Sequence, residues 1–272
     1  MLKLICTDLD RTLIPNGDQP ESPGARDRFA QLVSDNDMFL TYVTGRDQAS
    51  VKEAIATFRL PVPDFVIADV GTSIIQVSNA SWNRVTEWDE RLAKSWAGGE
   101  SGRISELLLD MEALQLQDIE NQKPHKLSYY VQVDNDIDAI IGEIGNRLKR
   151  AGIRTNIIWS IDPATRTGLL DILPDVANKR KAIEFLMDLQ GFSLDNTLFS
   201  GDSGNDLDVL ISPIKSVLVA NADPETREKV RLKAGENMKR VYIASGMGTM
   251  NGNYSAGILE GIYHYFPALK DQ

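Results

Sequence analysis

The stretch Phe199-Ser-Gly-Asp-Ser-Gly-Asn-Asp-Leu-Asp208 decides how this chain is organised. The residues from Thr197 to Ser200 have the character of a buried strand. The turn-rich loop that follows them carries two carboxylates, Asp202 and Asp206. This pattern predicts an acidic loop at the end of a strand.

A matching acidic loop lies near the N-terminus. The apolar run Leu2-Lys-Leu-Ile-Cys-Thr7 predicts a short buried strand, and Asp8 and Asp10 follow where it ends. Open α/β sheets bind ligands at the carboxyl ends of their strands. We therefore expect both acidic loops to open onto one crevice and to meet at one metal ion.

Strands and helices alternate in both outer thirds of the chain. In the first third, helices are expected at 24–34 and 47–58, and further strands at 39–43 and 65–68. In the last third, helices are expected at 178–189, 207–210, 224–234 and 255–266, and strands at 197–201, 216–220 and 240–243. This alternation is typical of a doubly wound parallel sheet, so we predict an α/β fold.

The middle third has a different order of elements. Apolar residues at helical spacing predict helices at 103–116 and 136–151. Strands are expected at 126–133, 154–159 and 168–173. Helices against a few strands are consistent with a small α+β insert that has its own core. We therefore expect a core domain of residues 1–78 and 174–272, with an α/β cap domain inserted at 79–173.

Composition and charge exclude several classes of protein. The 272 residues carry a net charge of −10, and an acidic surface repels nucleic-acid phosphates, so no nucleic-acid partner is expected. No apolar stretch is long enough to span a membrane, and the first residues lead into a strand instead of a signal peptide. The single cysteine, Cys6, excludes an intramolecular disulfide. These features predict a cytoplasmic protein without a membrane partner.

Polar groups gather at the ends of the expected strands and at the start of one helix. They are Asp8 with Asp10, Thr44-Gly-Arg46, Lys179, and Asp202 with Asp206. Carboxylates at this density repel one another unless a hard cation neutralises them, and Mg²⁺ favours a few carboxylates with waters and a substrate phosphate. Lys179 offers a point charge to a phosphoryl group, and Thr44 offers a hydroxyl. We therefore expect Mg²⁺ and phosphate at this site.

These segments together resemble the four motifs of the haloacid dehalogenase (HAD) superfamily in its phosphatase form. The resemblance implies that Asp8 is the nucleophile, and that Asp10 is the general acid for the leaving alkoxide and then the base for water. It also implies that Thr44 and Lys179 hold the phosphoryl oxygens. The implied Mg²⁺ ligands are Asp8, the backbone carbonyl of Asp10, Asp202, and Asp206 either directly or one shell further out.

The position of the insert resembles the cap of the HAD branch that hydrolyses sugar phosphates. Stretches similar to the sucrose-phosphate phosphatase family are Val70-Gly-Thr-Ser-Ile74, Lys126-Leu-Ser-Tyr-Tyr130, Gly201-Asp-Ser-Gly-Asn205 and Ser255-Ala-Gly-Ile-Leu-Glu260. This similarity implies that the chain hydrolyses a sugar phosphate, with sucrose 6-phosphate as the expected substrate. The residues expected to bind it are Gly45, Arg46, Lys126, Ser128, Tyr129, Ser203 and Asn205. One departure is Ser73, where the family commonly has Glu.

Other functions stay open at this stage. The substrate could be another compatible-solute precursor, mannosyl-3-phosphoglycerate or glucosylglycerol phosphate. A phosphomutase would use the same Asp pair and return the phosphoryl group to the sugar. A non-catalytic regulatory module could dock to a sugar-phosphate synthase, which is a second possible partner.

Individual residues also have alternative roles. Arg46 could pair with Asp47 or Asp69 at the surface instead of binding substrate. The polar residues of the expected strand at 126–133 could form its exposed face. The Gly-rich stretch 245–253 is expected to be a connecting loop.

Overall fold

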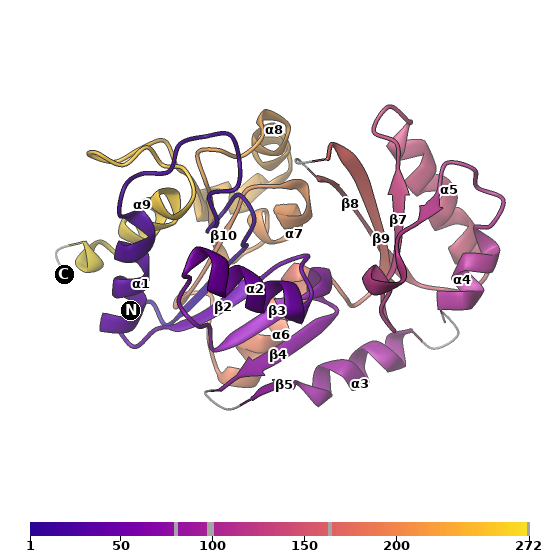
Figure 1. Cartoon of the computed structure of the whole chain (residues 1–272), viewed down its shortest axis with the longest axis horizontal. Helices are drawn as coiled ribbons and strands as arrows, with labels where there is room; N and C mark the ends of the chain where they lie inside the picture. The colour runs from indigo at the N-terminus through magenta and orange to yellow at the C-terminus, as the bar shows by residue number, and fades with distance from the viewer. Residues whose placement is uncertain (79–80, 97–100, 163–164, 271–272) are drawn as a thin grey trace.

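The computed structural model describes residues 1–78, 81–96, 101–162 and 165–270, and these residues form two β-sheets flanked by helices (Figure 1). In spatial order, the larger core sheet consists of β12 (Val241–Ile243), β11 (Lys215–Leu218), β10 (Thr197–Gly201), β1 (Leu4–Thr7), β2 (Phe39–Val43), β3 (Phe65–Ala68), β4 (Ser73–Val77) and β5 (Trp82–Arg84). The smaller cap sheet consists of β6 (Gln115–Leu116), β7 (Leu127–Val131), β9 (Thr167–Pro174) and β8 (Thr155–Asp162).

The strands from β12 to β3 of the core sheet all run parallel. Strands β4 and β5 extend the β3 edge in antiparallel fashion. Strand β1 lies between β10 and β2, so the two strands expected to carry the acidic loops are neighbours. The predicted doubly wound α/β fold is therefore confirmed, with an antiparallel edge that the sequence analysis did not predict.

Helices cover both faces of the core sheet (Figure 1). One face packs against α1 (Ala25–Asp35), α2 (Gln48–Phe58) and α9 (Ser255–Tyr265). The other face packs against α3 (Thr86–Ser95), α6 (Lys179–Gln190), α7 (Leu207–Leu210) and α8 (Pro224–Lys233). Each interface buries a large apolar cluster, and burial of apolar surface is the main favourable term in folding.

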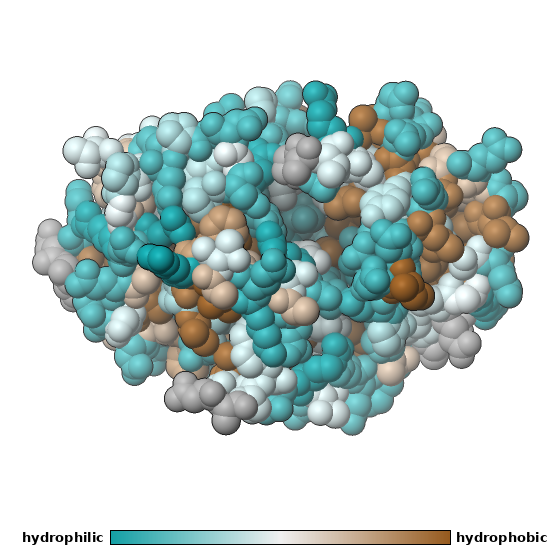
Figure 2. Space-filling view, viewed as in Figure 1, coloured by the Kyte–Doolittle hydropathy of each residue, from teal (hydrophilic) through white to brown (hydrophobic). Residues whose placement is uncertain are grey.

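The cap sheet has an apolar cluster of its own. Helices α4 (Ser101–Leu107) and α5 (Ile137–Arg150) pack on one of its faces. Ile144 and Leu148 of α5 meet Leu127 and Leu170 of the sheet there. In the view of Figure 2, hydrophilic residues cover most of the surface, while hydrophobic residues gather over the cap sheet and its helices.

The helix predicted at 103–116 was wrong in its second half. Helix α4 ends at Leu107, a turn follows, and β6 then pairs with β7. Met111 and Leu114 still pack against the apolar cluster of the cap sheet, although they do so from a turn. Their helical spacing therefore reflected burial on one side of the chain and not a continuous helix.

The division into a core domain and a cap domain stays a prediction. The expected boundary after residue 78 borders residues 79–80, which lie outside the described residues. Beyond them, β5 pairs with β4 of the core sheet. Trp88 and Leu92 of α3 join an apolar cluster of the same sheet. If the two sheets do mark two domains, the chain therefore first passes from the core domain to the cap domain after α3.

Within the described residues, no helix has both the length and the apolar character that crossing a membrane requires.

Candidate active site

Lys179 lies at the centre of the polar groups that follow β1 and β10. Its side chain is 1% exposed. The Nζ atom donates hydrogen bonds to Asp8 Oδ1 at 3.0 Å, to Asn205 Oδ1 at 2.8 Å and to Asp206 Oδ1 at 2.6 Å. The lysine, the first acidic loop and the second acidic loop therefore meet at one place, as the sequence predicts.

The start of helix α6 fixes the position of Lys179. Residues 175–178 connect β9 of the cap sheet to this helix. The Asn178 side chain accepts a hydrogen bond from the Lys181 backbone N–H and donates one to Asp208. Gly71 lies so close that a β-carbon there would be 2.5 Å from the Asn178 carbonyl and 2.9 Å from Lys179 N. The helix start is thus held by its own capping residue and by a backbone contact that only glycine permits.

Three carboxylates form a buried group suited to a divalent cation. Ligand atoms of Asp8, Asp202 and Asp206 lie within 4.8 Å of one another, and all three residues are buried. Asp202 Oδ1 accepts a hydrogen bond from the Thr12 hydroxyl, whereas Asp202 Oδ2 is buried without a hydrogen-bond partner in the described part of the chain. Arg11 Nε lies 3.4 Å from Oδ2 as an ion-pair partner. Because a buried carboxylate oxygen that lacks a hydrogen bond is costly, this donor set still fits a hard cation such as Mg²⁺.

The ionisation of these groups reflects burial and mutual repulsion. Burial raises the pKa of Asp8 to about 7; Lys179 opposes this shift, whereas Asp206 and Asp10 add to it. Burial, followed by the charges of Asp8 and Asp206, also raises the pKa of Asp202. Although burial disfavours the charged form of Lys179, Asp206 and Asp8 raise its pKa above the ordinary value. Without a cation, burial and mutual repulsion therefore disfavour the ionised forms of Asp8 and Asp202, and the charges of Lys179 and, for Asp202, Arg11 partly offset this effect.

Asp206 organises the loop that carries Asp202. Its Oδ2 atom accepts hydrogen bonds from the backbone N–H groups of Asp202 at 3.0 Å and Ser203 at 3.2 Å, while Oδ1 accepts the bond from Lys179. The Ser203 hydroxyl lies 3.1 Å from Asn205 Oδ1, so it also bonds within the loop. Both oxygens of Asp206 are thus occupied, which favours a position outside the first shell of a metal.

Arg46 binds the carboxylate of Asp10, the second acidic residue of the loop after β1. Its guanidinium donates to both oxygens of Asp10, from Nε at 2.7 Å and from Nη2 at 2.6 Å. Asn16 donates a further hydrogen bond to Asp10 Oδ1 at 2.7 Å. The side chain of Asp10 points toward these donors, and only its backbone carbonyl remains as the implied metal ligand. The partners expected for Arg46 were substrate, Asp47 or Asp69, and its pairing with Asp10 was not predicted.

The loop after β2 places the expected phosphate-binding groups beside this pair. Thr44 is 1% exposed, and its hydroxyl accepts a hydrogen bond from the Arg46 backbone N–H at 3.1 Å. Gly45 between them is exposed. The loop therefore presents the Gly45 backbone to solvent while the threonine side chain is held inside.

A strained segment after β3 forms hydrogen bonds with the Thr44 loop. Asp69, Val70 and Gly71 have consecutive positive φ angles of 51°, 59° and 99°. Backbone N–H groups of Asp69 and Val70 donate to the carbonyls of Arg46 and Thr44, at 3.0 and 3.1 Å. Non-glycine residues with positive φ carry a conformational cost and persist where surrounding contacts enforce them. This segment thus connects the Thr44 loop to the start of α6.

Two of the predicted sugar-binding residues, Lys126 and Ser128, lie on the face of the cap sheet that α4 and α5 do not cover, and both are buried, at 7% and 0% exposed. Ser128 Oγ donates a hydrogen bond of 2.5 Å to Asp171 Oδ1, and Lys126 Nζ lies 3.6 Å from the same oxygen. This face is directed toward the core. Ile158, paired with Asp171 across β8 and β9, packs against an apolar cluster of the core sheet. Burial raises the pKa of Asp69 in the core, and the nearby charges of Lys126 and Lys123 oppose the rise.

Tyr129, the third of these residues, lies on the opposite face of the cap sheet. Its ring joins the apolar cluster between the cap sheet and its helices, together with Leu127 and Val131. Successive side chains of a strand point to opposite faces, so Tyr129 cannot share a ligand with Ser128 on that strand. The sugar-binding roles of Lys126 and Ser128 stay predictions that this geometry supports, whereas the position of Tyr129 does not support the role expected for it.

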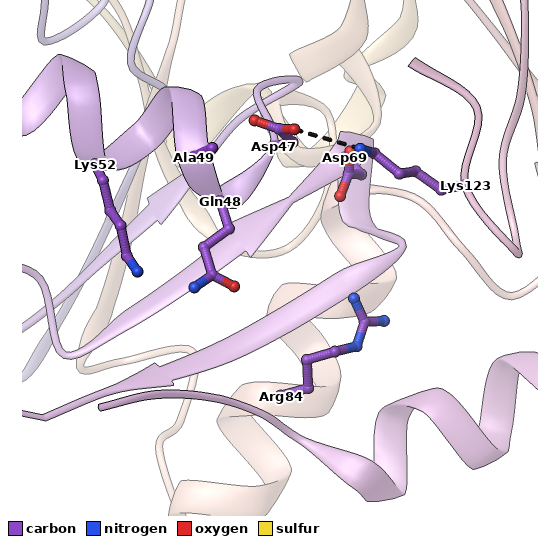
Figure 3. A pocket seen from close by; sticks show the side chains of 7 residues that line it. All are labelled: Asp47, Gln48, Ala49, Lys52, Asp69, Arg84 and Lys123. Carbon is purple, nitrogen blue, oxygen red and sulfur yellow. Dashed lines mark hydrogen bonds and ion pairs between the residues drawn. The ribbon is translucent and has the colours of Figure 1, made fainter. Parts of the chain in front are cut away.

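A hollow of about 360 Å³ lies between the core and the residues that precede β7 of the cap sheet (Figure 3). Its lining residues are Asp47, Gln48, Ala49, Lys52, Asp69, Arg84 and Lys123. Lys123, which precedes β7, reaches across to the core, and its Nζ lies 3.3 Å from Asp47 Oδ2 (Figure 3). Since Asp47 follows Arg46, this ion pair brings the residues before β7 to the edge of the acidic site.

Sequence reasoning missed several members of the site. Asn16, Asp171 and Asn178 each bond to a predicted site residue or place one. Asn178 had a usable signal, since Asn before a helix is a common capping residue. Asn16 and Asp171 had none, because their partners are set by loop geometry and by strand register.

Together, the fold and the acidic site define a member of the HAD superfamily of phosphatases. More narrowly, the chain belongs to the sucrose-6F-phosphate phosphohydrolase family, whose model matches residues 1–266. The resemblance inferred from the motifs is thereby confirmed.

Curated relatives agree with this assignment. A protein of Nitrosococcus oceani described as a HAD-like hydrolase is 45% identical, over 98% of this chain and 72% of its own length. Sucrose-phosphatase 1 of Nicotiana tabacum is 32% identical, over 96% of this chain and 59% of the tobacco protein. Mannosylfructose-phosphate phosphatase of Agrobacterium fabrum is 31% identical, over 97% of both chains. The chain thus spans little more than half of the tobacco relative and nearly all of the Agrobacterium one.

Among solved structures, a sucrose-phosphatase from Synechocystis in complex with sucrose and phosphate is similar to this chain. The TM-score is 0.81 at 27% identity, over 97% of this chain and 98% of the other.

Proposed function

We propose that this chain hydrolyses the phosphate ester of a sugar phosphate, with sucrose 6-phosphate as the first candidate. The observation that carries this proposal is the meeting of Asp8, Asp202 and Asp206 with Lys179, whose Nζ lies 3.0 Å from Asp8 Oδ1. A buried carboxylate with a fixed cation beside it suits a nucleophile that must receive a negatively charged phosphoryl group. Membership of the family supports the same reaction.

In the proposed mechanism, a carboxylate oxygen of Asp8 attacks phosphorus, and the bond from phosphorus to the sugar oxygen breaks. Asp10 gives its proton to the leaving alkoxide. Water then attacks the aspartyl phosphate, Asp10 takes a proton from that water, and inorganic phosphate leaves as the Asp8 carboxylate is restored. In the second half, Arg46 and Asn16 suit Asp10, because both donate hydrogen bonds to an ionised carboxylate.

The expected cofactor is Mg²⁺, held by Asp8, the backbone carbonyl of Asp10 and Asp202. When bound, this ion would offset the negative charge of carboxylates and phosphoryl oxygens. Asp206 would act from one shell further out, since both of its oxygens already accept hydrogen bonds. Thr44 and the Gly45 backbone would hold phosphoryl oxygens opposite Lys179.

For the sugar, we propose the face of the cap sheet that is directed toward the core, on which these polar residues are buried. Lys126, Ser128 and the newly found Asp171 offer both donors and acceptors to a polyhydroxylated ligand. Asn205 and Ser203 would lie between the sugar and the phosphate. The Agrobacterium relative makes mannosylfructose phosphate a second candidate, because the similarity covers 97% of its length.

The test is phosphate release with MgCl₂ from sucrose 6-phosphate, mannosylfructose phosphate, mannosyl-3-phosphoglycerate and glucosylglycerol phosphate. We expect the highest kcat/KM for sucrose 6-phosphate and no turnover by Asp8→Asn. The control Asp188→Asn changes an exposed carboxylate of α6 and should keep full activity. Release from none of the substrates, or equal rates for both variants, would contradict the proposal. A preference for another substrate would support the proposed reaction and contradict only the choice of sucrose 6-phosphate.

The other candidate functions have separate readouts. A phosphomutase would yield an isomerised sugar phosphate in place of inorganic phosphate. A regulatory module would show no turnover and would bind a sugar-phosphate synthase in a pull-down. The synthase partner and the cytoplasmic location otherwise stay predictions, the second to be checked by cell fractionation.

A further inference from the structure

Arg11, directly after Asp10, has a backbone conformation that is costly for an arginine. Its φ angle is 58°, in the left-handed region that favours glycine and asparagine. Backbone hydrogen bonds hold it there. Arg11 N donates to Asn16 Oδ1 at 2.8 Å, and its carbonyl accepts a bond from Asn221 Nδ2 at 2.6 Å. Residues in such a conformation cost free energy, persist where surrounding contacts enforce them, and cluster at functional sites.

The side chain of Arg11 points across the ends of neighbouring strands. It is 14% exposed, and its Nε lies 3.4 Å from Asp202 Oδ2 in the loop after β10. Its Nη2 donates to the Asn221 carbonyl at 3.2 Å and to Asp223 Oδ1 at 3.0 Å, in the loop after β11. Arg11 therefore links the first acidic loop to the second and to the loop next to it.

The oxygen that Arg11 approaches is the one best suited to a metal. Asp202 Oδ1 is occupied by the Thr12 hydroxyl, while Oδ2 is buried without a hydrogen-bond partner within the described ranges. The guanidinium and a divalent cation would thus lie beside the same oxygen, and like charges at this distance repel. Asp223, whose side chain is 52% exposed, offers the guanidinium a second anionic partner.

We propose that Arg11 is a positioning residue that stabilises the metal-free arrangement of Asp202 and lowers the affinity of the site for its divalent cation. The inference rests on the metal site of the proposed function. Arg11 offsets the charge of Asp202 before a cation arrives, and its positive charge opposes the cation once it is bound. The residue thus keeps the metal-free site ordered and makes metal binding weaker and more reversible.

The experiment compares Arg11→Gln with Arg11→Lys in the full chain, purified and treated with EDTA. Isothermal titration with MgCl₂ gives the Kd, and thermal unfolding gives Tm with and without the metal. For Arg11→Gln, we expect a lower metal-free Tm, a Kd for Mg²⁺ at least about threefold tighter, and a larger rise of Tm on adding Mg²⁺. Arg11→Lys keeps the charge and should stay close to the parent in Kd.

Arg227→Gln is the matched control. The Arg227 guanidinium donates to the backbone carbonyls of Ala220 and Ala222 in the same loop after β11. Its loss should lower Tm without changing the Kd for Mg²⁺. If Arg11→Gln does not fold, Arg11→Asn replaces it, since asparagine tolerates the left-handed conformation.

The possible results separate the two proposals. A parent protein that binds no Mg²⁺ would overturn the metal site itself, and the role of Arg11 with it. A parent that binds Mg²⁺ while the neutral Arg11 variants bind it equally or more weakly would overturn only the role of Arg11. Tighter binding by the neutral variants, with Arg11→Lys and Arg227→Gln unchanged, would support it.

Discussion

The guanidinium of Arg46 and the carboxylate of Asp10 form a two-point hydrogen-bonded pair, with distances of 2.6 and 2.7 Å. Paired hydrogen bonds of this kind fix orientation as well as charge. Arg46 therefore holds the proposed acid and base in one rotamer beside Asp8. We therefore expect Arg46 to act in the chemical step more than in sugar binding.

Arg46→Met should accordingly reduce kcat more than it changes KM. We expect kcat for sucrose 6-phosphate to fall about 10- to 100-fold, since a misplaced general acid or base loses part of its contribution. Steady-state kinetics would measure both constants. Arg180→Met is the control, because Arg180 pairs with Glu184 on the surface of α6. A raised KM with an unchanged kcat would show that Arg46 contacts the substrate instead.

Lys179→Met should destabilise the metal-free protein strongly. The change leaves buried Asp8 and Asp206 without their shared cation, and breaking a buried ion pair costs about 3–5 kcal/mol. Urea unfolding in EDTA would measure the loss of unfolding free energy, and Lys181→Met, on the exposed side of the same helix, should lose little. Equal losses in both variants would mean that Lys179 does not compensate the carboxylates.

Metal binding should depend on pH through Asp8. Its pKa is raised from the ordinary value of 3.8 to about 7. The folded, metal-free state therefore binds more protons than the unfolded state between about pH 4 and pH 7, and its stability should fall as pH rises through that range. Because Mg²⁺ requires the ionised carboxylate, binding below about pH 7 should release a proton and weaken up to about tenfold per pH unit.

Calorimetric titration with MgCl₂ at pH 6 and pH 8, in two buffers of different ionisation enthalpy, would measure both the affinity and the proton release. Asp188→Asn should keep the same dependence, as its carboxylate is exposed and distant in the helix from Lys179. An affinity that is equal at the two pH values, with no proton released, would contradict a raised pKa of Asp8.

Gly71→Ala should impair both stability and activity. A β-carbon would meet the Asn178 carbonyl at 2.5 Å and also suffer the positive φ of 99°. Gly191→Ala is a matched control at the other end of α6, with a φ of 71° and open space around it. We expect Gly191→Ala to lose about 1 kcal/mol and Gly71→Ala at least twice that amount, together with a fall in kcat. Similar losses and full activity in both would show that the contact with α6 is not tight.

Lys126→Met should weaken binding of the sugar without slowing turnover of a phosphate ester that lacks one. We expect KM for sucrose 6-phosphate to rise at least about fivefold, while kcat/KM for p-nitrophenyl phosphate stays unchanged. Tyr129→Phe should leave both substrates unaffected, because its ring packs in the cluster behind the sheet. A larger effect for Tyr129→Phe than for Lys126→Met would place the sugar elsewhere.

The sequence predicts the parts of this site that depend on strand ends. Asp8, Thr44 and Asp202 follow parallel strands, so the fold class alone brings them to one edge of the sheet. Lys179 was predictable through its place in the ordered set of motifs. Contacts between loops were not, and the pairing of Arg46 with Asp10 depends on backbone geometry that no spacing encodes.

The sequence also did not reveal which face of the sheet each strand residue occupies or where every strand and helix ends. A strand was predicted at residues 126–133, and β7 confirms it at Leu127–Val131, yet its sequence does not tell whether Ser128 or Tyr129 points to the core. The antiparallel strands β4 and β5 were missed, because short strands after a strained turn give little periodic signal. The helix predicted to continue to residue 116 shows the converse, since helical spacing occurred there without a helix.

The short connection from β9 to α6 has a consequence for how such proteins can be altered. Residues 175–178 leave the cap sheet and end at the catalytic lysine candidate, and Asn156 of β8 bonds to the Ala177 carbonyl within them. Anyone who grafts a different cap onto this core to change its sugar preference would therefore also reset the position of Lys179. A successful chimera has to keep the exit strand, its direction and this connection as one unit, so new selectivity and retained turnover cannot be designed separately.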